Sequence, residues 1–95
     1  MRFEWDSRKA NSNNAKHDVA FEVAELVWDD PARIVVFDRN ETGEERWHAI
    51  GLVRGVMILT VNHVYRGQDG EEVVRIIGAR KATLAERGRY EAQDD

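Results

Sequence analysis

The chain has 95 residues, of which 42% are hydrophobic and 34% charged, with one proline and no cysteine. This length excludes two cores of ordinary size, and this composition excludes a mostly disordered chain. The lack of cysteine excludes disulfides, thiolate metal sites and cysteine nucleophiles, and the three histidines lack metal-ligand spacing. We therefore expect a single domain over 1–95 that uses no metal and no other cofactor.

The charge is unevenly distributed around a net value of -4. Residues 22–45 carry a net charge of -6, whereas residues 75–89 carry +4. Residues 7–17 contain basic side chains and no acidic one. A local anion site on an acidic body and a set of salt-bridged, solvated faces both fit this pattern. The longest strongly apolar stretch, 56–59, is too short to cross a membrane, and the N-terminus lacks a secretory apolar region, so we expect a cytoplasmic protein.

The first elements in chain order are two helices. Asp6 is a good N-cap, which predicts a helix from Ser7 to about His17. This helix has a small apolar face and a polar stripe at i, i+4 and i+7. The stripe consists of Lys9, Asn13 and Lys16. A second helix over about 20–28 places Phe21 and Trp28 on one face, which we expect to enter the core.

Strands follow from Arg33 onwards, where short β-branched runs alternate with turn residues. The expected strands are 33–38, 45–53, 56–65 and 72–80. Their connections are short, which forces neighbouring antiparallel pairing. The sequence therefore predicts an antiparallel meander.

The C-terminal segment contains a capping-box pattern, in which Thr83 and Glu86 satisfy each other's backbone amides. This pattern predicts a helix from Leu84. Gly88 costs such a helix about 1 kcal/mol relative to alanine, so we expect it to fray after Tyr90 and to leave 91–95 as a flexible acidic tail. The fold class is α+β, with two N-terminal helices, an antiparallel meander and a C-terminal helix.

The last strand carries two arginines. A period of two puts Arg80 on one face together with Ile76, and Arg75 on the other face. Arg80 directly precedes the capped helix, where free amides and the helix dipole favour an anion, so a phosphate fits there. A salt bridge from Arg80 to Glu86 or Glu91 explains the same spacing equally well.

If the anion is RNA, its cleavage without a metal needs a base for the 2′-hydroxyl, an acid for the leaving 5′-oxygen and cations for the phosphorane. The available side chains are Lys16, His17, Arg46, His48, Arg80 and Tyr90. The sequence favours a structural interpretation of two histidines, with His48 as a surface strand residue and His63 as a hydrogen-bonded, half-buried one. No serine lies in a nucleophile elbow and no glycine loop cradles a phosphate, which excludes serine hydrolases and nucleotide-driven enzymes.

A series of short motifs resembles a known family. The motifs are Phe3-Glu4-Trp5-Asp6, Lys9, Asn13, Lys16-His17, Phe21-Glu22, Glu45-Arg46, Ile50-Gly51, Arg66, Arg75-Ile76-Ile77, Ala79-Arg80-Lys81-Ala82-Thr83, Glu86-Arg87 and Tyr90. They cover nearly the full length of the chain, and in this order they resemble the BrnT toxins.

This resemblance implies a RelE-like ribonuclease fold and a toxin of a type II toxin-antitoxin system. Such a toxin inhibits translation by cutting RNA, here without a metal, and a BrnA-type antitoxin neutralises it. The antitoxin brings a ribbon-helix-helix part, so operator DNA is bound only through the complex, for which the resemblance suggests a hetero-tetramer.

The resemblance also implies roles for individual residues. Arg80 with Arg46 would hold and stabilise the phosphate, Lys16 or His17 would transfer protons, and Tyr90 would orient the substrate. RNA-binding roles would fall to Lys9, Asn13, Arg66 and Arg75.

Several positions depart from the family pattern, among them His63-Val64, which stands where the family often has an aromatic residue or histidine followed by threonine. Gly78 stands where the usual residue is serine, and Asp18 replaces the usual glycine after the histidine. Gly78 and the acidic balance favour an alternative, an inactive toxin relative that binds an antitoxin. A plain nucleic-acid-binding domain is a third reading, which is weakened because only two short segments are basic.

Overall fold

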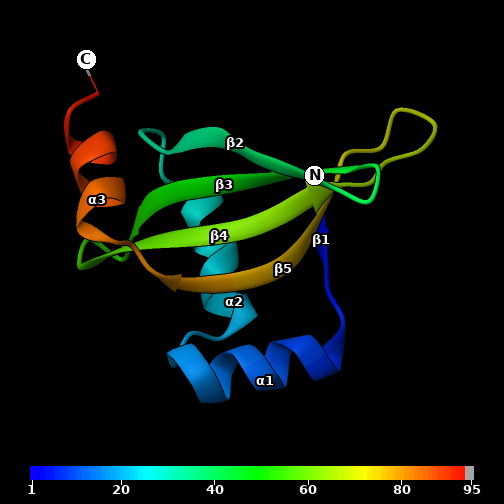
Figure 1. Ribbon diagram of the computed structural model, residues 1–95, viewed down its shortest axis with the longest axis horizontal. Coiled ribbons are helices and arrows are strands. Elements are labelled where there is room, and N and C mark those ends of the chain that lie inside the picture. Colours follow the sequence, from blue (N-terminus) through cyan, green and yellow to red (C-terminus); the bar gives the residue numbers. More distant parts are fainter. Residues whose placement is uncertain (94–95) are drawn as a thin grey trace.

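The computed structural model describes residues 1–93 and contains one five-stranded sheet (Figure 1). Along the chain, helices lie between the first and second strands, and one more helix follows the last strand. The elements are β1 Arg2–Glu4, α1 Ser7–His17, α2 Phe21–Ala24, the 3-10 helix η1 Glu25–Asp29, β2 Ile34–Glu41, β3 Glu44–Val53, β4 Met57–Tyr65, β5 Val73–Lys81 and α3 Leu84–Glu91. This arrangement confirms the predicted α+β class; its RelE-like character stays a prediction.

The sheet has the order β1-β5-β4-β3-β2. Strands β2 to β5 form the expected antiparallel meander. Strand β1, which pairs in parallel with β5 over Arg2–Glu4, was not predicted from the sequence. Three residues joined to the rest by a helix are too few to show a strand pattern of their own, and only the neighbouring β5 gives them a partner.

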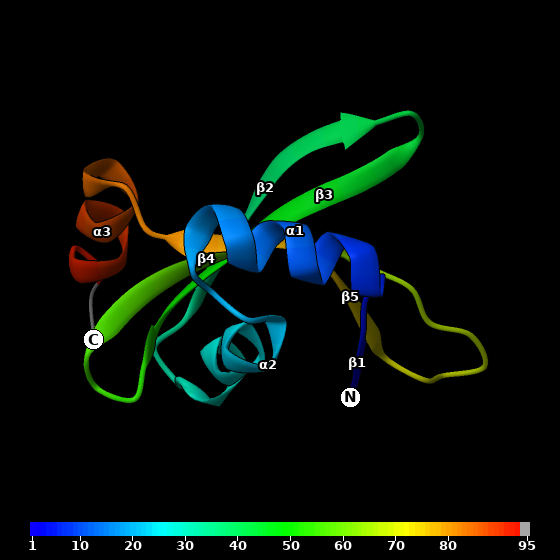
Figure 2. The ribbon, with the colours of Figure 1, turned by 90° about the horizontal axis from the view of Figure 1, so that it is seen from below.

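The core lies between one face of the sheet and the helices α2 and η1, whereas α1 runs along the sheet edge beside β5 and α3 lies apart at the end where β5 finishes (Figure 2). The predicted helix over 20–28 is a four-residue α-helix that continues as η1 to Asp29. Of the two residues expected to enter the core, Phe21 is fully buried and Trp28 packs, partly buried, against the core, while Ala24 and Val27 are fully buried beside them.

The polar helix α1 is attached to the sheet through Asn13. Beyond β1, the outer edge of β5 has no neighbouring strand. There the Asn13 side chain accepts from the Ala79 N–H at 3.1 Å and donates to the Ala79 carbonyl oxygen at 2.9 Å, and it also donates to Val19 at 3.1 Å. One amide thus replaces a strand partner, which explains how a helix with no buried residue packs on the sheet.

A β-bulge in β5 corrects the predicted face assignment. Asn62 pairs with Gly78, but its neighbour His63 pairs with Ile76, so Ile77 is the extra residue. Since adjacent residues of β4 point to opposite faces, Ile76 faces the core, away from Gly78 and Arg80. Strict alternation along β5 was therefore wrong. By the same shift Arg75 shares the face of Arg80 instead of lying opposite it.

Helix α3 begins at Leu84 as predicted, with both bonds of the capping box present between Thr83 and Glu86. It continues to Glu91, one residue beyond the expected fraying point. Of the predicted tail over 91–95, residues 94 and 95 lie outside the described residues, and Gln93 donates to the Ala32 carbonyl oxygen at 2.7 Å.

Among residues 1–93, no helix is both long and apolar enough to span a membrane.

Candidate active site

The sheet face opposite the core contains a pocket of about 320 Å³ near the end of β5. Register explains why polar side chains meet there. His48, Asn62 and Gly78 form one row across β3, β4 and β5, and Thr60 pairs with Arg80 in the adjacent row. The residues lining the pocket are Asn13, His17, Asp38, Arg39, His48, Thr60, Asn62, Gly78, Ala79 and Arg80.

Arg80 and Glu86 form a two-point ion pair at the edge of this pocket. The Arg80 Nη1 and Nη2 atoms donate to Glu86 Oε1 and Oε2 at 2.6 and 3.0 Å. The Thr60 hydroxyl and the Thr83 N–H also donate to Glu86 Oε1, each at 2.9 Å. These partners, Arg80 first, lower the pKa of Glu86 to about 2. The salt-bridge interpretation of Arg80 is confirmed.

His48 lies between two carboxylates. Its Nε2 atom is 3.6 Å from Asp38 Oδ2, and its Nδ1 atom is 4.0 Å from Glu86 Oε2. Asp38 occupies the irregular step in β2 between Phe37 and Arg39, where the register with β3 shifts. Such a bulge re-aims a side chain, and here the Asp38 carboxylate is near the His48 ring.

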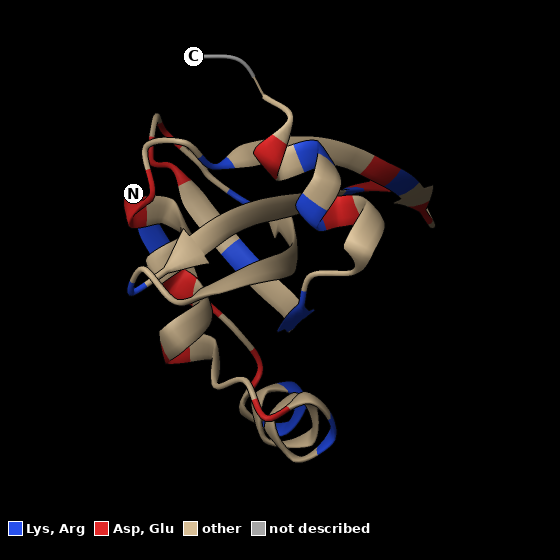
Figure 3. Ribbon diagram, turned by 90° about the vertical axis from the view of Figure 1, so that its left-hand side faces the viewer, with Lys and Arg blue, Asp and Glu red and all other residues tan. Residues whose placement is uncertain are grey.

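The structure brings only some of the predicted site residues into this pocket. Arg80, His17 and Asn13 line it. Lys9 and Lys16 line an adjacent groove along α1 with Arg8 and Ser12, and that groove shares Asn13 and His17 with the pocket. Helix α1 carries no acidic residue and appears with blue segments only in Figure 3.

Arg46 and Tyr90 do not line the pocket. Arg46 lies two residues before His48 on β3, and its Nη1 atom is 3.5 Å from Glu41 Oε2. The Tyr90 hydroxyl donates to Asp30 Oδ2 at 2.5 Å, and this bond is the main reason why the pKa of Tyr90 rises to about 12. Tyr90 thereby connects α3 to the segment before β2.

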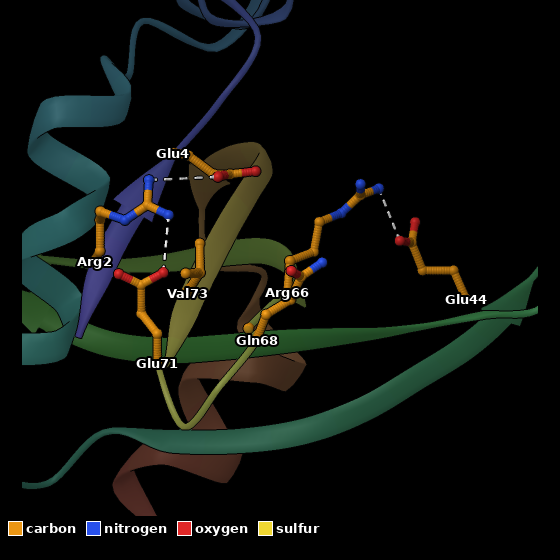
Figure 4. A pocket seen from close by; sticks show the side chains of 8 residues that line it. Arg2, Glu4, Glu44, Arg66, Gln68, Glu71 and Val73 are labelled. Atoms are coloured by element: carbon orange, nitrogen blue, oxygen red, sulfur yellow. Dashed lines mark hydrogen bonds and ion pairs between the residues drawn. The ribbon is translucent and has the colours of Figure 1, made fainter.

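Arg66 and Arg75 lie at the opposite end of the sheet, and each is paired with a carboxylate. Arg66 donates to Glu44 and Arg75 to Glu4, both at 2.9 Å. Arg66 lines a separate pocket of about 490 Å³ with Arg2, Glu71 and other residues (Figure 4). The structure therefore does not bring these two arginines together with Arg80.

Seven residues of the pocket were not predicted as site residues: Asp38, Arg39, His48, Thr60, Asn62, Gly78 and Ala79. His48 was considered only as one of several available side chains, and Thr60 and Asn62 lie in an apolar strand where β-propensity hides their role. The available signal was their spacing of two residues, which places Thr60 and Asn62 on the same face of the strand. Arg80, which pairs with Thr60, lies on that face as well.

Comparison with known proteins identifies the class. Residues 5–86 match the model of a family described as "Ribonuclease toxin, BrnT, of type II toxin-antitoxin system". The chain is also similar to the crystal structure of the Brucella abortus ribonuclease toxin, BrnT, with 27% identity and a TM-score of 0.67 over 88% of this chain and 99% of that one. A search of curated proteins gave no match. The fold and the matches together define a ribonuclease toxin of a type II toxin-antitoxin system. Within that class, the chain belongs to the BrnT family.

Proposed function

We propose that this chain is an endoribonuclease that inhibits translation by cutting RNA without a metal ion. The observation that carries this proposal is that the Arg80 guanidinium lines a single pocket together with two imidazoles, those of His17 and His48. Among the described residues 1–93, no group of three or more His, Cys, Asp and Glu side chains has the geometry of a metal site. In this proposal the chain itself supplies the cations and the proton carriers.

Arg80 holds the scissile phosphate in this proposal. Glu86 engages one hydrogen on each terminal nitrogen, so the outward hydrogens and Nε remain for phosphoryl oxygens. About a third of the side chain is exposed, at 34%. Because Glu86 fixes the plane of the guanidinium, Arg80 is oriented before the substrate arrives, which reduces the ordering cost at the transition state.

In the reaction, the ribose 2′-oxygen attacks phosphorus and the bond from phosphorus to the 5′-oxygen breaks. A base takes the 2′ proton and an acid returns a proton to the 5′-oxygen, leaving a 2′,3′-cyclic phosphate and a 5′-hydroxyl. We assign these two proton transfers to His17 and His48, which line the pocket together with Arg80. Lys16 lies in the adjacent groove, where its charge attracts the RNA backbone instead.

The remaining predicted residues act around this centre. Lys9 in the groove along α1 contacts the RNA chain, and Arg46 adds positive charge two residues from His48. Tyr90 holds α3 against Asp30 and thereby positions Glu86, one helical turn away on the same helix face. Asn13 positions α1 on β5, and Arg66 and Arg75 bind RNA only if the chain extends across the far end of the sheet.

Membership of a type II family implies an antitoxin partner. We propose that this partner is of the BrnA type, that it covers the pocket, and that its ribbon-helix-helix part binds operator DNA in a hetero-tetrameric complex. The cytoplasm, where translation and operator DNA are both accessible, is the proposed site of action.

A second candidate function is antitoxin binding by a catalytically weak relative. The ion pair that occupies both terminal nitrogens of Arg80 favours it, since a phosphate must share the guanidinium with Glu86. Gly78, which presents no side chain in the pocket, favours it as well.

Expression of the chain alone separates the two functions. We expect growth arrest that the neighbouring antitoxin gene relieves, and cleavage of an unstructured RNA by the purified protein in EDTA. Arg80→Lys should lose activity about a hundred- to thousandfold because a point charge cannot replace the planar fork. Arg87→Lys, at an exposed position of α3, is the matched control. Healthy growth with soluble toxin would favour the antitoxin-binding function.

A further inference from the structure

Asn62 carries a buried acceptor that faces no donor. The residue is half-buried in the middle of the pocket row, between His48 on β3 and Gly78 on β5. Its side-chain oxygen Oδ1 is inaccessible to solvent and has no hydrogen-bond partner within the described part of the chain. Buried side-chain oxygens are nearly always satisfied in native proteins. Because the Asn62 side chain lines the pocket and its terminal torsion turns easily, rotation of the amide would present this unpaired acceptor to a donor on a ligand.

The space beside Asn62 is open because its cross-strand neighbour is a glycine. A Cβ atom placed on Gly78 would meet only Asn13 Oδ1 at 3.6 Å and the Asn62 Cβ atom at 4.0 Å, both ordinary contact distances. Gly78 does not have a positive φ, so backbone conformation does not require glycine there. The glycine therefore leaves room for a ligand group next to the Asn62 amide.

The position of Asn62 relative to Arg80 selects the kind of donor. Thr60 pairs with Arg80, and Asn62 pairs with Gly78. Asn62 therefore lies on the same face as Arg80, the residue proposed to hold the phosphate, and two residues along the strand from the partner of Arg80. In RNA, the 2′-hydroxyl is attached to the carbon next to the one that carries the 3′-phosphate. A nucleobase donor lies farther from that phosphate.

We infer that Asn62 is a specificity residue, whose Oδ1 accepts a hydrogen bond from the ribose 2′-hydroxyl beside the phosphate held by Arg80. This inference rests on the proposed function and names the feature of the substrate that the pocket reads. A 2′-deoxy sugar leaves the acceptor unsatisfied, so the pocket discriminates RNA from DNA by binding, before any chemistry. The bond also orients the hydroxyl beside His48, the cross-strand neighbour of Asn62.

Binding of mononucleotides tests this role without requiring turnover. Adenosine 3′-monophosphate and its 2′-deoxy form are titrated separately into the protein, and amide chemical shifts of the pocket residues report the affinity. We expect the ribonucleotide to bind about 5- to 30-fold more tightly than the deoxynucleotide. Asn62→Leu should bring the two affinities together while phosphate binding persists.

Two further variants make the result specific. Asn11→Leu applies the same substitution on an exposed position of α1 and should keep the wild-type ratio. Gly78→Ser retains Asn62 but places a hydroxyl beside its amide, and it should also reduce the ratio. An unchanged ratio in Asn62→Leu, equal wild-type affinities, or shifts outside the pocket would each overturn the inference. If the ratio behaves as expected while the wild type cuts no RNA, the proposed function fails and the sugar-reading site stands.

Discussion

His63 is fully buried, and within residues 1–93 the polar partners of its ring lie on its own strand. Its Nδ1 atom donates to the Val61 carbonyl oxygen at 3.0 Å, and Nε2 accepts from the Tyr65 hydroxyl at 3.2 Å. Burial lowers the pKa of His63 to about 4. The half-buried, hydrogen-bonded histidine predicted from sequence is therefore more deeply buried than expected, because the ring packs edge-on against Trp28.

This burial predicts a loss of stability as the pH falls from about 6.5 to about 4. In that range His63 is protonated in the unfolded chain but stays neutral in the folded protein. The free energy of unfolding therefore decreases as the pH falls, by up to about 3 kcal/mol. Urea denaturation at several pH values measures this decrease in the free energy of unfolding. His63→Phe should remove this part of the pH dependence, and a slope that survives the substitution would contradict the assignment.

Glu86 acts in a lower pH range. Its pKa of about 2 lies below the ordinary value of 4.5, so its stabilisation is complete above pH 4.5 and is lost as the pH falls toward 2. Glu86→Gln should flatten the stability curve in that range and, at neutral pH, weaken the hold on Arg80. Thermal unfolding between pH 5 and 2 checks the first effect. Glu91→Gln, near the exposed end of α3, is the control, and equal curves for both variants would rule out the assignment.

At the scale of elements, the residue that caps the C-terminus of helix α1 has an unfavourable backbone conformation. Asp18 has φ 58° and ψ 38°, in the left-handed region, where its N–H donates to the Asn14 carbonyl oxygen. Glycine adopts this conformation without a Cβ clash. Asp18→Gly should raise the free energy of unfolding by roughly 0.5–1 kcal/mol, and Asp18→Ala should not. Equal stabilities of the two variants in chemical denaturation would argue against strain at this cap.

The elements themselves were largely predictable, since capping residues, β-branched runs and short turns are local signals. Thr83 and Glu86 fixed the start of α3, and Arg54 and Gly55 form the expected tight turn with φ of 55° and 68°. The failures were non-local. The parallel pairing of β1 depends on β5, and the bulge at Ile77 changes which side chains share a face without leaving a mark in composition.

The candidate site was predictable only where family motifs reached it. Arg80 and His17 fall inside the pocket, but Tyr90 binds Asp30 and Lys16 lies in the adjacent groove. His48, Asn62 and Asp38 could not be assigned because strand register and a β2 irregularity bring them together. Such contacts require knowledge of which residues stand opposite each other on neighbouring strands.

At the scale of the whole molecule, acidic and basic residues are separated along the chain. The described basic residues of α1 lie beside the pocket, whereas residues 22–45 are strongly acidic. If the antitoxin covers the basic side with acidic groups, attraction at a distance should raise the association rate. Stopped-flow mixing at increasing NaCl should then show progressively slower association. A rate that does not respond to salt would place the interface elsewhere.

The amide of Asn13, which occupies the edge of β5 at Ala79, has a consequence for self-association. An exposed strand edge is a template on which another chain can add a strand, and a side chain that already uses both backbone groups blocks that addition. Because Asn13 is part of helix α1, its side chain protects the edge of β5 only while α1 stays packed against the sheet. Partial unfolding that detaches α1 would release the template and convert a reversible local opening into a route to aggregation.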